Sequence, residues 1–137
     1  MLAKVPLFAG LDAEAIEAIA GFGFQKTFQA GELIVEEGRT GNGMFIIVSG
    51  RAEVIKGLNT ARPRTVATLG AGEPIGEMAL LGEWPRTASV RAVETTECMG
   101  IDRWIFLDHL NREPKLALRL LQILALRLAN TGERLAE

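Results

Sequence analysis

Residues of the types that bind anions and hydroxyl groups gather between Gly72 and Val90. Gly76 and Glu77 open a short helical pattern, and Arg86 follows ten residues after Gly76. A glycine at a helix start lets a ligand approach the backbone, where free N–H groups and the helix dipole favour an anion. Arginine adds a planar fork of donors that matches phosphate oxygens, whereas Glu77 is suited to accept hydrogen bonds from sugar hydroxyls. The stretch therefore predicts a site for a sugar phosphate or a nucleotide.

The composition is that of a globular protein of one domain. The chain has 137 residues, of which 48% are hydrophobic and 23% charged, with a net charge of -2. This balance disfavours a general nucleic-acid surface, which is normally basic. No apolar run reaches the roughly 18 residues of a membrane span, and the single cysteine, Cys98, excludes an internal disulfide. We expect a cytoplasmic protein that binds neither nucleic acid nor a membrane directly.

Short strand patterns separated by glycines fill residues 22–102. Several of them partly alternate between apolar and polar residues, as half-buried strands do, and Ser49-Gly50 lies where a two-residue hairpin turn would fit. No helices alternate with these strands, which disfavours a Rossmann-type sheet and favours an antiparallel barrel or sandwich. The candidate strands are Phe24–Phe28, Leu33–Glu36, Met44–Val48, Ala52–Lys56, Thr65–Leu69, Thr87–Val93 and Glu97–Ile101.

Helices are expected at both ends of the chain. Asp12 can cap a first helix that ends at Gly21, and Asp102 can cap a second over Arg103–Asn111. Pro114 is placed to start a third helix that runs towards Leu135.

The third helix carries two apolar stripes. One follows a 4, 3, 4, 3, 4 spacing with one polar member, which is the pattern of a coiled-coil seam, and the other could pack on the strands. The pattern leaves open whether the seam joins two copies of the chain or forms one broad intramolecular face. The seam consists of Ala117, Leu121, Leu124, Leu128, Thr131 and Leu135, and the second stripe of Leu116, Leu120 and Ile123.

Residues 72–90 resemble the phosphate-binding cassette of the cyclic nucleotide-binding domain family, of the catabolite activator and protein kinase A regulatory-subunit type. The likeness lies in Gly76-Glu77 followed by Pro85-Arg86-Thr87-Ala88, and residues 44–54 are similar to the family's glycine-punctuated strands. The resemblance implies a mainly β fold with flanking helices: an eight-stranded antiparallel β-roll, similar to a double-stranded jelly roll, with an N-terminal helix and two C-terminal helices. The whole chain, 1–137, would be one domain, with an N-terminal helical segment at 1–21, the β-roll at 22–102 containing the cassette at 72–90, and the C-terminal helices at 103–137.

The resemblance also implies a cyclic nucleotide as ligand, cAMP first and cGMP next, with no metal. Arg86 would bind the cyclic phosphate, Glu77 the ribose 2′-hydroxyl, and the last helix would close over the base. That helix is also implied as a homodimer interface, and an unidentified effector domain or protein would sense its position. The further implied ligand contacts are Gly76, Met78, Ala79, Thr87, Ala88, Val54, Val66, Ile75, Arg127 and Thr131.

Some residues depart from the family pattern or allow another interpretation. Pro74 stands where family cassettes often carry an aromatic residue, Gly132 replaces a hydroxyl residue of the activator type, and no helix-turn-helix follows in this sequence. Arg86 could instead pair with Glu83 on the surface. In the same way, Glu77 could only cap the short helix, Thr87 could be a plain strand residue, and Thr131 could only set the register of a helix pair.

Two other functions compete with the sensor. A metal-dependent enzyme on a similar β-roll needs several histidines around the metal, and the chain has one, His109. We therefore expect no catalytic activity. The alternative is an interaction scaffold on the same fold that binds no ligand or a cyclic dinucleotide, against which Glu77 and Arg86 count.

Overall fold

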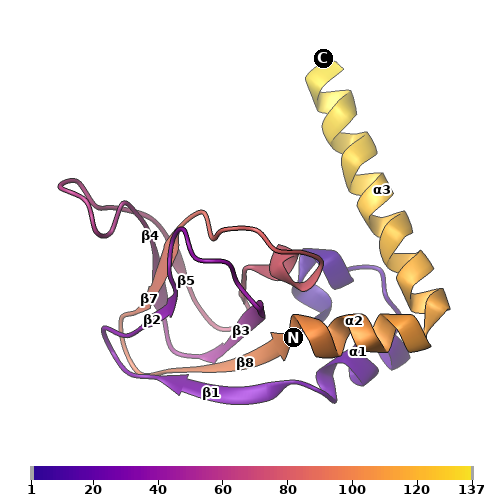
Figure 1. The fold of residues 1–137 in the computed structure, drawn as a ribbon, viewed down its shortest axis with the longest axis horizontal. Helices are drawn as coiled ribbons and strands as arrows, with labels where there is room; N and C mark the ends of the chain where they lie inside the picture. The colour runs from indigo at the N-terminus through magenta and orange to yellow at the C-terminus, as the bar shows by residue number, and fades with distance from the viewer. Residues whose placement is uncertain (1, 137) are drawn as a thin grey trace.

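The structure of the chain, a computed structural model, describes the backbone of residues 2–136 and the side chains of residues 2–130. Two four-stranded antiparallel sheets form the body, in the orders β1-β8-β3-β6 and β2-β7-β4-β5. The expected eight-stranded antiparallel β-roll is thereby confirmed within these residues (Figure 1). Its strands are β1 (Phe24–Phe28), β2 (Leu33–Val35), β3 (Gly43–Ser49), β4 (Ala52–Lys56), β5 (Arg64–Leu69), β6 (Pro74–Ile75), β7 (Ser89–Ala92) and β8 (Thr96–Asp102).

Two strand predictions differ from the structure near the cassette. The short β6 was missed, because two residues that include a proline carry no alternating pattern. The strand expected at Thr87–Val93 begins only at Ser89 and ends at Ala92, since Thr87 and Ala88 belong to the loop that leads into it. The other strand ends agree with the predictions to within one residue.

Six helical elements flank the β-roll within residues 2–136. They are the 3-10 helices η1 (Leu2–Lys4), η2 (Pro6–Phe8) and η3 (Glu77–Leu80), and the α-helices α1 (Ala13–Ala20), α2 (Arg103–Arg112) and α3 (Pro114–Ala136). Both predicted caps are confirmed: Asp12 accepts from the N–H of Ala15 at 2.8 Å, and Asp102 from that of Trp104 at 2.9 Å. The two short 3-10 helices at the N-terminus were not predicted, since three residues are too few to show a helical period.

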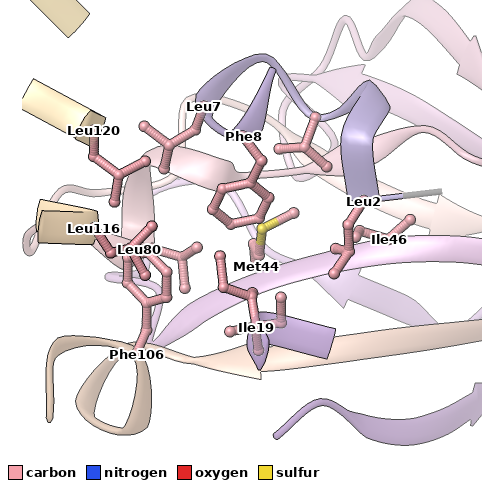
Figure 2. Packing of buried hydrophobic residues seen from close by; sticks show 12 residues of the cluster. Leu2, Leu7, Phe8, Ile19, Met44, Ile46, Leu80, Phe106, Leu116 and Leu120 are labelled. Carbon is pink, nitrogen blue, oxygen red and sulfur yellow. The ribbon is translucent and has the colours of Figure 1, made fainter. Parts of the chain in front are cut away.

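A core cluster joins the N-terminal segment, the cassette and the C-terminal helices. Phe8 of η2 lies against Phe106 of α2, with ring centroids 5.9 Å apart, and Leu80 of the cassette is fully buried among them (Figure 2). Leu116 and Leu120 of α3 complete this cluster, so these two members of the second stripe pack inside the chain, whereas Ile123 is only partly buried and is not part of the cluster. The last helix, which is expected to close over the base, is therefore packed at its start against the same core as the cassette.

Two leucines of the seam stripe of α3 lie outside this core, and Thr131 and Leu135 of the same stripe lie outside the residues whose side chains are described. Leu121 and Leu128 are 64% and 73% exposed, whereas Leu124 is partly buried against the core. The C-terminal part of α3 extends away from the β-roll (Figure 1). Among the side chains of residues 2–130, these two exposed leucines, one heptad apart, form an apolar strip that the chain does not bury.

A second cluster fills the interior of the β-roll and includes Cys98. Its thiol is fully buried, and burial raises the pKa of Cys98 from its ordinary value of 9.0 to about 11. The thiol is therefore protonated at neutral pH and acts as a small apolar side chain. None of the described helices combines the length and apolar character that crossing a bilayer requires.

Candidate ligand-binding site

The backbone turns at Gly76, between β6 and η3. Gly76 has φ 68 and ψ 42, in the left-handed region that glycine adopts without a steric penalty. The N–H of Ala79 then donates to the carbonyl of Gly76 at 3.1 Å and closes the first turn of η3. Because the first N–H groups of a helical turn have no acceptor within it, this turn offers backbone donors to an anion.

Arg86 is held at this turn through its backbone and its side chain. Its N–H donates to the carbonyl of Arg39, and its own carbonyl accepts from the N–H of Gly38, both at 2.8 Å. The guanidinium donates from Nη1 to the carbonyl of Gly76 at 3.3 Å and from Nη2 to that of Gly43 at 2.6 Å. Burial lowers the pKa of Arg86, yet an arginine remains protonated in a protein. The site therefore carries a half-buried positive charge at a fixed place.

Two glycines make room for the guanidinium. A Cβ atom at Gly41 or at Gly76 would collide with the side chain of Arg86. Gly76 thus serves both the turn and the arginine, and Gly41 lies on the loop between β2 and β3. Gly41 was not recognised in the sequence, because nothing in a single glycine shows which distant side chain it accommodates.

Two cavities adjoin both Arg86 and the turn at Gly76. One, of about 250 Å³, opens between the sheets and is lined by Val35, Val54, Leu69, Pro74, Ile75, Gly76, Arg86, Thr87, Ala88 and Val90. The other, of about 380 Å³, is lined by Pro74, Gly76, Glu77, Met78, Ala79, Trp84, Pro85, Arg86 and Thr87. The first has an apolar wall with one cation and one hydroxyl at its edge, which is the usual make-up of a pocket for a small polar ligand.

Glu77 connects the cassette to both ends of the chain. Its Oε2 accepts from the N–H of Leu7 in η2 at 3.1 Å, and its Oε1 lies 3.9 Å from Nη2 of Arg127 in α3. The side chain is only 14% exposed. Glu77 therefore does more than cap η3. The N-cap position belongs to Gly76, and the carboxylate of Glu77 contacts η2 and α3.

The structure brings most of the predicted site residues together around the two cavities. Those that line at least one of them are Val54, Ile75, Gly76, Glu77, Met78, Ala79, Arg86, Thr87 and Ala88. Arg127 lies outside both linings and reaches the cassette through Glu77.

Val66 and Thr131 are not brought to these cavities by any described contact. Val66, on β5, is 45% exposed and does not line either cavity. Thr131 lies outside the residues whose side chains the structure describes, so its role stays a prediction. Among the described side chains of α3, none lines the cavity between the sheets.

Glu83 pairs with a different arginine from the one considered in the sequence. Its Oε1 lies 3.3 Å from Nη2 of Arg103, the first residue of α2. The guanidinium of Arg86 instead donates to the two glycine carbonyls, so the alternative that Arg86 pairs with Glu83 on the surface is wrong. Among the residues that the structure describes, no three His, Cys, Asp or Glu side chains gather where they could hold a metal ion.

Comparison with known proteins places the chain in a family. The family model described as "Cyclic nucleotide-binding domain" matches residues 25–113. This covers more than half of the chain, together with the β-roll, the cassette turn and Arg86. The chain belongs to the cyclic nucleotide-binding domain family.

Individual relatives come from bacteria and from a eukaryote. The chain is 35% identical over 123 residues to the cyclic AMP receptor protein of Thermus thermophilus, which covers 90% of this chain and 57% of that protein. It is 34% identical over 107 residues to a cGMP-dependent protein kinase of Caenorhabditis elegans, covering 77% of this chain and 14% of the kinase. The chain therefore spans less than two thirds of the length of these curated relatives.

A solved structure supports the same fold. The N-terminal domain of a transcriptional regulator from Streptomyces coelicolor A3(2) superposes with a TM-score of 0.87 at 27% identity, covering 98% of this chain and 94% of that one. The match includes the flanking helices as well as the β-roll, because nearly all of both chains is aligned.

Proposed function

We propose that the chain is a regulatory sensor module that binds cAMP, with cGMP as second choice. The ligand would reach from the cavity that Glu77 lines into the adjoining cavity between the sheets. The observation that carries this proposal is the position of Arg86. Its guanidinium lies at the edge of that cavity, beside the backbone turn at Gly76. A cation and backbone donors that meet at one point suit a phosphate, and an apolar cavity beside them suits a base.

Binding a phosphate requires Arg86 to exchange partners. The guanidinium now donates to two neutral carbonyls, those of Gly43 and Gly76. Hydrogen bonds to a charged phosphate are stronger than bonds to a neutral carbonyl, so the exchange favours the ligand. Because arginine has five N–H donors, it can also retain one carbonyl while it binds the phosphate.

A calorimetric titration with cAMP, cGMP and a cyclic dinucleotide tests this function. We expect cAMP to bind at one site per chain, cGMP to bind more weakly, and the cyclic dinucleotide to give no heat of binding. If neither mononucleotide bound while the cyclic dinucleotide did, the scaffold alternative would replace the proposal. No binding of any of the three would contradict a sensor of cyclic nucleotides.

Replacing Glu77 by glutamine tests the proposed contact with the ribose. We expect E77Q to weaken cAMP binding by about tenfold, since a hydrogen bond to a charged acceptor is worth roughly 1.5–3 kcal/mol and the amide retains part of it. For 2′-deoxy-cAMP, which lacks the hydroxyl, wild type and E77Q should bind with nearly equal affinity. An equal loss for both ligands would assign Glu77 to its contacts with Leu7 and Arg127 instead.

The proposed regulation is a shift between two populations. Glu77 contacts both the N-terminal segment and α3. A ligand that binds this carboxylate would therefore change the hydrogen bond to Leu7 and the ion pair with Arg127. In the proposal, ligand favours a state in which the last helix closes over the base. An attached effector domain or a partner protein then senses the position of that helix.

A further inference from the structure

Arg103 is a charged residue buried in the core, with only 3% of its side chain exposed. Its Nη1 donates to the carbonyls of Gly41 at 2.9 Å, Gly82 at 3.0 Å and Ala79 at 3.3 Å. Its Nη2 donates to Oε1 of Glu83 at 3.3 Å. One guanidinium thus binds the loop between β2 and β3, the end of η3 and the turn that follows it.

Each of these acceptors belongs to a segment that shapes the anion site. Gly41 is one of the two glycines against which the guanidinium of Arg86 lies. Ala79 closes the turn of η3 that offers backbone donors to the proposed phosphate, and Gly82 lies four residues before Arg86. Arg103 therefore fixes both sides of the Arg86 side chain without lining either cavity.

Arg103 is also where the C-terminal helices begin. It is the first residue of α2, and α2 continues through a single residue into α3. The same side chain therefore connects the cassette to the start of the helical segment whose position is the proposed output.

We propose that Arg103 is a positioning residue that holds the cassette in its ligand-binding shape and transmits a change of that shape to α2 and α3. This inference rests on the proposed function, because the site in question is the cyclic nucleotide site. Arg103 acts through Gly41, Ala79 and Gly82 and does not touch the ligand.

The chemistry of the position requires arginine rather than lysine. A guanidinium offers five donors in a plane, whereas an ammonium is a compact point charge that cannot reach three carbonyls and a carboxylate together. A buried charge is also costly unless it is paired and hydrogen-bonded, and here Glu83 supplies the opposite charge. Arg103→Lys therefore preserves the positive charge and removes the planar arrangement of donors.

Two tryptophans report on this position. The ring of Trp104 lies over Arg103, with the guanidinium carbon 5.3 Å from the ring centroid. The ring of Trp84 lies so close to Gly82 that a Cβ atom there would come within 2.6 Å of it. The chain has only these two tryptophans, so its intrinsic fluorescence reports the surroundings of Arg103 and of the turn that it binds.

The test compares R103K with R112K. Arg112 lies on the same helix, is 76% exposed and pairs with Asp108, so its variant is a matched control. In the ligand-free chain, R103K should raise hydrogen exchange at residues 76–82 and 41–43, and R112K should not. We expect R103K to weaken cAMP binding by about tenfold, as the loss of one or two hydrogen bonds implies. It should also reduce the ligand-induced changes in tryptophan emission and in exchange of residues 112–136.

A double variant separates positioning from general destabilisation. In the R86A background, R103K should cause no further loss of affinity, since its effect passes through the arrangement around Arg86. An equal loss in both backgrounds would show a merely structural role and overturn the proposal. If R103K does not fold, E83Q replaces it, because Glu83 is 67% exposed and its loss leaves the guanidinium in place. E83Q should raise exchange at residues 76–82 to a smaller extent.

The outcomes also separate this inference from the proposed function. If wild type bound no cyclic nucleotide, the proposed function would fail, and the ligand-free exchange at 76–82 and 41–43 would still decide whether Arg103 holds the cassette. If wild type bound cAMP while R103K matched R112K in exchange and affinity, the role of Arg103 would be wrong and the function would stand.

Discussion

Replacing Arg86 by alanine is expected to weaken cAMP binding by about one to two decades, measured by calorimetric titration. A hydrogen bond to a charged group is worth roughly 1.5–3 kcal/mol, and each 1.4 kcal/mol is about tenfold in affinity. The variant also leaves the carbonyls of Gly43 and Gly76 without their present donor. The loss of affinity should be larger for ligands that carry the cyclic phosphate than for ligands that lack it.

Arg39→Ala is the matched control for this variant. Arg39 lies on the loop between β2 and β3, its side chain is 79% exposed, and its ion pair is with Glu36. Its backbone carbonyl accepts from the N–H of Arg86, and this bond survives the substitution. R39A should bind cAMP as wild type does. Unchanged affinity in R86A, or an equal loss in both variants, would remove Arg86 from the phosphate site.

The antiparallel strands could be predicted because their signals are local, whereas the β-roll that they form was implied by the resemblance of residues 72–90 and 44–54 to the family. Alternating residues and glycine turns set the strands, and the side chains of Asp12 and Asp102 fix where α1 and α2 begin. The two-residue strand β6 and the N-terminal 3-10 helices could not be predicted, because such short segments form through tertiary contacts rather than through a periodic pattern.

The candidate site likewise contains residues that the sequence predicts and residues that it does not. Gly76, Glu77 and Arg86 were predicted because their types and spacing carry chemistry by themselves. Gly41 and Arg103 were not, since each acts on a segment far away in the sequence: Arg103 is 62 residues from Gly41, whose carbonyl it binds. Among 15 lysines and arginines, nothing in the sequence distinguishes a buried arginine from an exposed one. Three-dimensional packing alone identifies the support of the cassette.

We propose that two copies of the chain pair through the exposed strip on α3. Such a dimer explains why the strip is apolar. Leu121 and Leu128 are one heptad apart and exposed, and Leu124 lies between them at the coiled-coil spacing. Such a strip would be costly in a chain that remained alone, since apolar surface favours burial. Dimerisation would also place a second α3 beside the first, whose C-terminal part extends from the body (Figure 1).

The double variant L121E/L128E should therefore be monomeric in size-exclusion chromatography with light scattering, at concentrations where wild type is a dimer. Each buried leucine contributes about 1.5 kcal/mol or more, and the interface contains both positions twice, so the dissociation constant should rise by about four decades. Both side chains are exposed in the single chain, so its helical circular dichroism should persist.

Leu126→Glu is the control that separates a seam from general surface hydrophobicity. Leu126 is 63% exposed on the same helix, but five residues, or nearly one and a half turns, separate it from Leu121, so it faces the opposite side. L126E should leave the dimer intact. A wild-type chain that is monomeric at every concentration would contradict the seam, and so would an equal effect of L126E and the double variant. If the wild-type chain were monomeric, α3 would pack only within its own chain. If L126E had the same effect as the double variant, association would be non-specific, because a coiled-coil seam depends on which face of the helix carries the leucines.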